Sequence, residues 1–74
     1  MVAKNEEKYW REYYAREARR HWLEFPWELL GVFTAIIGCN DYTSERKVKQ
    51  IQWAMDAYNK EMKEAANNGK NLSD

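Results

Sequence analysis

Apolar residues recur every three or four positions in three segments of this chain, which cover residues 3–25, 26–38 and 44–66. This spacing is typical of α-helices that bury one face. The pattern predicts a single all-α domain over residues 1–74: a three-helix bundle, or a helical hairpin with a long amphipathic amino-terminal helix. We expect residues 67–74 to form a frayed tail.

The boundaries between these segments carry the usual helix start and stop signals. Pro26 suits the first turn of a helix, because its fixed φ matches and its missing N–H is not needed there. Gly38, followed by polar residues, marks an end. Thr43 or Ser44 is the expected N-cap of the third helix, and Gly69 lies near its expected end.

The central segment is the most apolar part of the chain. One side of the expected helix is formed by large residues, namely Leu29, Leu30, Phe33, Ile36 and Ile37. The other side is formed by small residues, namely Gly31, Thr34, Ala35 and Gly38. A helix with these two sides can have neighbours on both, since the small side lets a second backbone approach closely. A buried strand is the alternative, but the segment does not alternate and its ends carry helix caps.

The amino-terminal segment carries two neighbouring stripes. The first is expected to face the core and consists of Trp10, Tyr14, Ala18, His21 and Phe25. The second combines aromatic rings with guanidinium groups and consists of Tyr9, Tyr13, Arg16, Arg20 and Leu23. Tyr and Arg carry much of the binding energy at protein interfaces, so the second stripe is a candidate partner surface. The alternative is a solvated face whose arginines pair with Glu12, Glu17 and Glu24.

The third segment has the most regular spacing. Its apolar residues alternate by three and four, as in a coiled-coil seam: Val48, Ile51, Met55, Tyr58, Met62 and Ala65. We expect this seam to pack on another helix, either within the chain or in a second copy. A homo-oligomer through the seam and the small side of the central helix is compatible with this pattern, whereas a monomer suffices if the first and third helices form a pair across the central helix.

Trp53 does not belong to that seam. On a helical wheel it lies roughly opposite the seam's centre, near Arg46, Lys49 and Lys60. A Trp exposed among cations has the composition of an interface hot spot. The alternatives are a cation–π contact with Arg46 or Lys49, or burial against the amino-terminal helix.

Composition excludes several classes of function. Twelve basic and twelve acidic residues cancel, which gives no general attraction to nucleic acid. One Cys and one His cannot build a structural zinc site, and no motif for catalysis, metal binding or a cofactor is present. The apolar run is shorter than the roughly 20 residues of a membrane-spanning helix. Without a secretory signal in its first residues, the chain is expected to be cytoplasmic.

These observations favour a small non-enzymatic protein that binds another protein, as an inhibitor or adaptor of the kind often carried by phages. The expected interaction residues are Tyr9, Tyr13, Arg16, Arg20, Arg46, Lys49, Trp53 and Lys60. The second hypothesis is a helix-turn-helix protein that reads nucleic acid. It would use the start of the third helix, with Arg46, Lys47, Lys49 and Gln50 in a groove.

Overall fold

The protein is all-α, as the apolar spacing predicts. The computed structural model describes residues 4–73, and the side chains of residues 5–67. The chain forms α1 (Lys4–Glu17), a π-helical turn η1 (Ala18–Trp22), α2 (Glu28–Ile37) and α3 (Ser44–Ser73), with no strand among the described residues. Residues 1–3, where the first helix was expected to begin, lie outside the described part.

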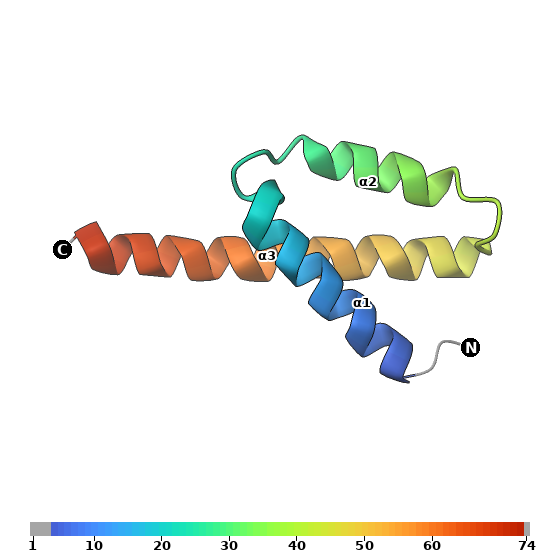
Figure 1. Ribbon diagram of the computed structural model, residues 1–74, viewed down its shortest axis with the longest axis horizontal. Helices are drawn as coiled ribbons and strands as arrows, with labels where there is room; N and C mark the ends of the chain where they lie inside the picture. The colour runs from blue at the N-terminus through green and yellow to red at the C-terminus, as the bar shows by residue number, and fades with distance from the viewer. Residues whose placement is uncertain (1–3, 74) are drawn as a thin grey trace.

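The helices form two layers. Figure 1 shows α2 running beside the amino-terminal part of α3 in the opposite direction, with α1 crossing α3 obliquely. The molecule measures 48 × 26 × 15 Å along its principal axes. The shortest dimension matches two helices stacked about 8–10 Å apart. The amino-terminal helix therefore lies across one side of α3, with η1 against α2, and no described helix covers the opposite side of the hairpin.

The first helix is not a regular α-helix up to residue 25. The Leu23 N–H donates to the Ala18 carbonyl at 3.0 Å, five residues back, which is the π-helical pattern. This wider turn keeps Tyr14, Ala18 and Trp22 in line, and all three are buried. Trp22 therefore occupies the core position that the regular spacing assigned to His21, which is only half-buried.

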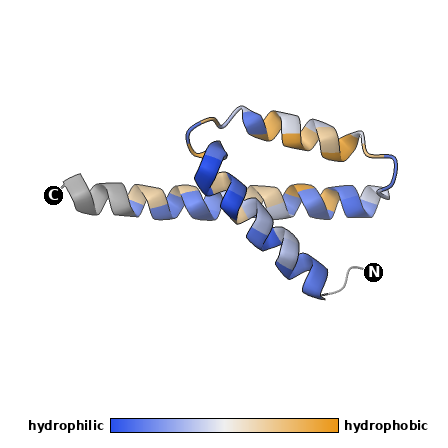
Figure 2. Ribbon diagram, in the orientation of Figure 1, coloured by the Kyte–Doolittle hydropathy of each residue, from blue (hydrophilic) through white to orange (hydrophobic). Residues whose placement is uncertain are grey.

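The central helix is the most apolar of the three, as the colouring of Figure 2 shows. It begins at Glu28 rather than Pro26, because the residues before it form tight turns. The Glu28 N–H donates to Phe25 O at 3.0 Å, and the next N–H donates to Pro26 O at 3.1 Å. The helix ends at Ile37, and the Gly38 N–H donates to Thr34 O at 2.9 Å. The predicted boundaries are thus correct to within two residues.

Thr43 is the N-cap of α3, as predicted. Its hydroxyl oxygen accepts a hydrogen bond from the Arg46 N–H at 3.1 Å, which satisfies one free donor of the first turn. The carboxy-terminal boundary was predicted too early, because α3 continues to Ser73 instead of ending near residue 66. A Gly inside a helix costs only about 1 kcal/mol relative to Ala, so Gly69 does not have to stop it. Residue 74 lies outside the described part.

The core lies where α1 and η1 cross α3 and meet α2. Its buried members are Tyr14, Ala18, Trp22, Leu29, Trp53, Ala54 and Ala57. Ala18 and Ala54 are completely buried, and such small side chains let α1 and α3 approach closely at the crossing. Ile36 of α2 is buried as well.

The predicted seam of α3 is not its buried face. The side chains of Val48, Met55 and Met62 are exposed, whereas the buried residues of the helix are Gln50, Trp53, Ala54, Ala57 and Glu61. The seam has the more regular spacing, but the opposite stripe of α3 combines the large ring of Trp53 with the small side chains of Ala54 and Ala57. The two alanines let α1 approach closely, and the indole ring is then buried between the helices, so α1 packs on this stripe.

Candidate protein-binding surface

The outer side of α1 carries an aromatic row that leads from solvent into the core. Tyr9 is 57% exposed and stacks on Tyr13, with ring centroids 6.5 Å apart and ring planes 11° from parallel. Tyr13 contacts Tyr14 edge to face at 5.5 Å, and Tyr14 lies 5.8 Å from the buried ring of Trp22. The exposed rings are therefore held in fixed positions by neighbours that belong to the core.

Arg16 near the end of α1 and Arg20 in η1 are both exposed. The other three arginines of the chain form ion pairs: Arg11 with Glu7 and Asp56, Arg19 with Glu61, and Arg46 with Glu6. Within the described residues, no carboxylate lies within 4 Å of Arg16 or Arg20. The expected alternative pairs with Glu12, Glu17 and Glu24 do not form, so both guanidinium groups are available to a partner.

Tyr9, Arg16 and Arg20 are exposed, and Tyr13 beside them is half-buried. We call these four residues the Tyr–Arg surface. Beside it, an open groove of about 320 Å³ runs between α1 and α2. Aromatic and aliphatic side chains line most of it, and they include Trp10, Tyr13, Trp22, Val32, Ile36 and Tyr42. Tyr13 belongs to both features. A bound segment can therefore insert an apolar side chain into the groove while its polar groups meet the arginines.

Trp53 is not part of an exposed surface. It is 4% exposed and is covered by the crossing helix. The guanidinium carbon of Arg46 lies 5.8 Å from the centroid of its ring and 5.1 Å from that of Tyr42. The hot-spot interpretation was therefore wrong, and both alternatives hold: Trp53 is buried against the amino-terminal helix and also makes a cation–π contact.

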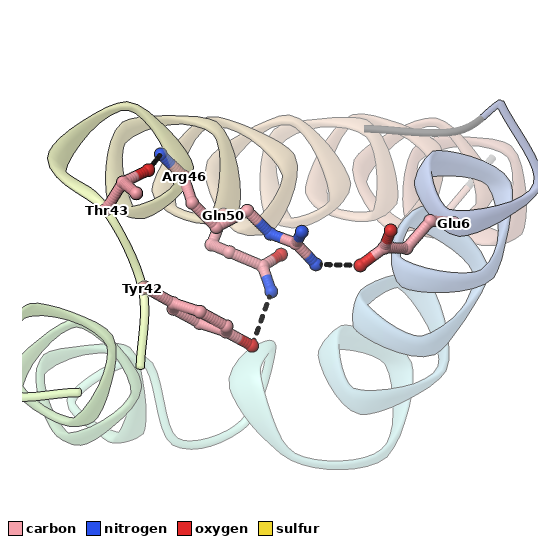
Figure 3. Close-up of polar contacts among 5 residues, drawn as sticks. All are labelled: Glu6, Tyr42, Thr43, Arg46 and Gln50. Atoms are coloured by element: carbon pink, nitrogen blue, oxygen red, sulfur yellow. Dashed lines mark hydrogen bonds and ion pairs between the residues drawn. The ribbon is translucent and has the colours of Figure 1, made fainter. Parts of the chain in front are cut away.

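Arg46 belongs to an internal polar network rather than to a binding surface (Figure 3). Its guanidinium group is held by the carboxylate of Glu6 from α1, and its side chain is only 19% exposed. One turn further along α3, the Gln50 amide donates to the Tyr42 hydroxyl at 3.1 Å. These contacts join α1, the turn before α3 and α3 itself.

The two predicted lysines are exposed, in two different places. Lys60 lines a shallow hollow together with Arg16 and Arg19, so it extends the Tyr–Arg surface toward α3. Lys49 lies in another hollow with Glu6 and Trp10, at the opposite end of α1. The structure therefore brings five of the eight predicted residues together, leaves Lys49 apart, and places Arg46 and Trp53 inside.

Sequence reasoning missed the groove between α1 and α2. Tyr42 lies in the turn before α3, outside the three periodic segments, and Trp22 falls outside the regular stripe of the first helix. The π-helical turn that places Trp22 beside the groove has no simple signal in the sequence. The one available clue was the number of aromatic residues, since a chain with four Trp and five Tyr has more rings than a small core requires.

Burial also changes the acidity of one ring in this region. Tyr14 has its pKa raised from 10.0 to about 12, first because burial disfavours the phenolate and then because of the neighbouring Tyr42 and Tyr13. Arg46 acts in the opposite direction. Tyr14 therefore remains protonated at neutral pH and acts as a packed aromatic ring.

Neither a metal site nor a membrane span is found in the described part of the chain. No three His, Cys, Asp or Glu side chains there lie close enough together to hold a metal ion. No helix among the described residues is long and apolar enough to cross a membrane. Comparison with known proteins finds no match to a family model, to a curated protein or to a solved structure.

Proposed function

We propose that this chain is a non-catalytic protein-binding module, an inhibitor or adaptor that acts in the cytoplasm by occupying a partner's surface. The observation that supports this most directly is the Tyr–Arg surface. It combines a stacked tyrosine pair, of which Tyr9 is exposed and Tyr13 half-buried, with two exposed arginines that have no carboxylate partner among the described residues. Tyr and Arg are the residue types that most often dominate binding energy at protein interfaces.

The surface also suggests the chemistry of the partner. Arg16 and Arg20 favour carboxylates, which a guanidinium group binds through two parallel hydrogen bonds. The adjacent groove is mostly apolar and accepts an aliphatic or aromatic side chain. The partner segment that fits best carries acidic residues next to an apolar anchor. Such a segment gains affinity from the anchor and orientation from the ion pairs.

The helix-turn-helix hypothesis has less support from the contacts. Of its expected base-reading residues, Arg46 is paired with Glu6, the ammonium of Lys47 donates to the Ile37 carbonyl, and Gln50 is 1% exposed. Figure 1 shows α2 lying alongside α3, whereas the two helices of that motif cross at about 90–120°. We therefore propose protein binding alone.

The test is affinity purification of the tagged protein from a nuclease-treated lysate, with bound proteins identified by mass spectrometry. The double variant Arg16→Ala/Arg20→Ala is compared with Lys63→Ala, which removes an exposed cation of α3. We expect one stoichiometric protein that is retained by wild type and by Lys63→Ala but lost by the double variant. If no protein depends on the two arginines, the proposed surface is wrong. Nucleic acid that co-purifies without nuclease and dissociates in salt would instead favour the helix-turn-helix hypothesis.

A further inference from the structure

The bare face of the α2–α3 hairpin is a second surface, distinct from the Tyr–Arg surface. Among the described residues, seven large apolar side chains are exposed, and five of them lie here: Leu30, Ile37, Val48, Met55 and Met62. They are between 37% and 68% exposed. The half-buried side chains of Phe33, Ile51 and Tyr58 lie between them. We call these eight residues the α2–α3 face.

The α2–α3 face points away from α1 on both helices. On α2, the residues beside α1 include Val32 and Ala35, and Leu30 lies about 150° around the helix from them. On α3, the residues beneath α1 include Trp53 and Ala57, and Met55 lies about 160° from both. No helix of the described chain covers this side (Figure 1).

None of the eight side chains of the α2–α3 face is charged, and the ammonium group of Lys47 lies at its edge, where it donates to the Ile37 carbonyl. Nine charged residues occur in α3 between residues 44 and 67, and each lies at least about 80° from Met55 around the helix. The only charged residue of α2 is Glu28, which lies about 160° from Leu30. The cations and carboxylates of α3 therefore lie outside the arc of these apolar side chains, while the exposed amides of Gln52 and Asn59 lie within about 60° of Met55.

The spacing along this face is that of a helix–helix interface. Val48, Met55 and Met62 are seven residues apart, with Ile51 and Tyr58 between them. Leu30 and Ile37 of α2 are also seven residues apart. Side chains that repeat every seven residues interdigitate with an equivalent helix at a shallow crossing angle. The face is therefore complementary to helices of the same spacing.

The exposed area is larger than a monomer of this size requires. A folded monomer of 8.9 kDa exposes about 4,800 Å². This chain exposes 5730 Å², about 900 Å² more, and a standard interface buries about 800 Å² on each partner. Its radius of gyration is 13.8 Å, against about 11 Å for a globular chain of 74 residues. The surplus is of the size that one dimer interface buries, and the part of α3 that extends past the α1 crossing contributes to it (Figure 1).

We propose that the α2–α3 face binds a second copy of this chain. Two hairpins related by a two-fold axis form a four-helix bundle, with one α1 on each outer side. The apolar centre of the face meets the same centre on the second copy, so no charged side chain has to be buried there, and the nearest charges of α3 lie at its edges. The dimer also enlarges a small core, three of whose seven buried residues are alanines. Both Tyr–Arg surfaces stay exposed, because they lie on the outer helices.

Multi-angle light scattering on the full chain tests this over a range of concentrations. We expect a particle of twice the 8.9 kDa chain mass for wild type. The variant Leu30→Lys/Met55→Lys should have the single-chain mass with its helical circular dichroism retained, since both side chains are exposed in one chain. Tyr9→Lys, which charges an exposed ring on α1, should keep the doubled mass.

A second measurement does not depend on how the variants fold. The Tm of the wild-type chain should rise with protein concentration, because association stabilises the folded state by mass action. A wild-type chain that keeps the single-chain mass and a constant Tm at every concentration overturns the proposal, and the face then belongs to another protein or to a lipid surface. A doubled mass that survives Leu30→Lys/Met55→Lys also overturns it, because the dimer would use a different surface.

Discussion

At the scale of single residues, Trp53 shows why a helical wheel alone does not identify a binding site. Its position among cations is correct, and Arg46 does lie over its ring. The same ring is nevertheless the largest side chain between α1 and α3, and a small chain seldom leaves such a ring exposed. Its role is to hold the two layers together.

Replacement of Trp53 by Ala should therefore destabilise the fold rather than a complex. We expect the free energy of unfolding to fall by about 3–5 kcal/mol, the usual cost of truncating a buried Trp. Chemical denaturation monitored by circular dichroism measures it. The matched control is Trp27→Ala, at a position that is 64% exposed, where we expect a loss of about 1 kcal/mol or less. Equal losses at the two positions would show that Trp53 is not in the core.

Tyr14 gives the fold a pH dependence in the alkaline range. The unfolded chain releases this proton near pH 10.0 and the folded chain near pH 12, so the folded state binds more protons between these values. The contribution of Tyr14 to the free energy of unfolding is complete below pH 10 and is lost as the pH rises through 12. A shift of two units corresponds to about 3 kcal/mol. Denaturation at several pH values measures the loss, and Tyr14→Phe should reduce it. An identical pH profile for this variant would contradict the assignment.

At the scale of elements, the local signals were sufficient for helix number and for most helix ends. Pro26, Gly38 and Thr43 act through their own backbone and side-chain chemistry, so the sequence is enough to locate them. The buried face of α3 is different, because this helix carries two apolar stripes. Which one is buried depends on the path of α1, and that path depends on the π-helical turn and on the alanines at the crossing.

The candidate site was predicted where it depends on one helix only. Tyr9, Tyr13 and Arg16 share a face of α1 because of their helical spacing, and Arg20 follows in η1. Arg46 could not be assigned in the same way, because Glu6 reaches it from a helix 40 residues away in the sequence. Contacts over such a distance are set by the packing of the layers and not by local spacing.

A substitution at Gly31 tests whether another helix packs against the small side of α2. Gly31 lies inside the helix, and a Cβ atom added there would meet nothing within 4 Å. Gly31→Ala should raise the free energy of unfolding by about 0.5–1 kcal/mol, because Gly loses more backbone entropy in a helix than Ala. Thermal and chemical denaturation measure this gain. Gly38→Ala is the contrasting variant, since its Cβ would lie 3.3 Å from the Thr34 carbonyl oxygen. A loss of stability in Gly31→Ala would mean that another helix packs closely on that side.

At the scale of the whole molecule, α1 divides the protein into two surfaces with different chemistry. Its outer side combines tyrosines and unpaired arginines beside an aromatic groove, which suits a foreign partner. The side of the hairpin that α1 leaves bare is apolar and uncharged, which suits a second copy. A dimer of this kind presents two partner surfaces at once, and bivalent binding increases the apparent affinity if a target carries two sites.

Partner binding should depend on the Tyr–Arg surface and not on the α2–α3 face. The most direct measurement compares capture of the partner protein by wild type, Arg16→Ala/Arg20→Ala and Leu30→Lys/Met55→Lys at equal amounts of folded protein. We predict that only the arginine variant loses the partner and that the hairpin variant retains it, with weaker apparent affinity if binding is bivalent. Retention of the partner by the arginine variant, or its complete loss in the hairpin variant, would contradict the account.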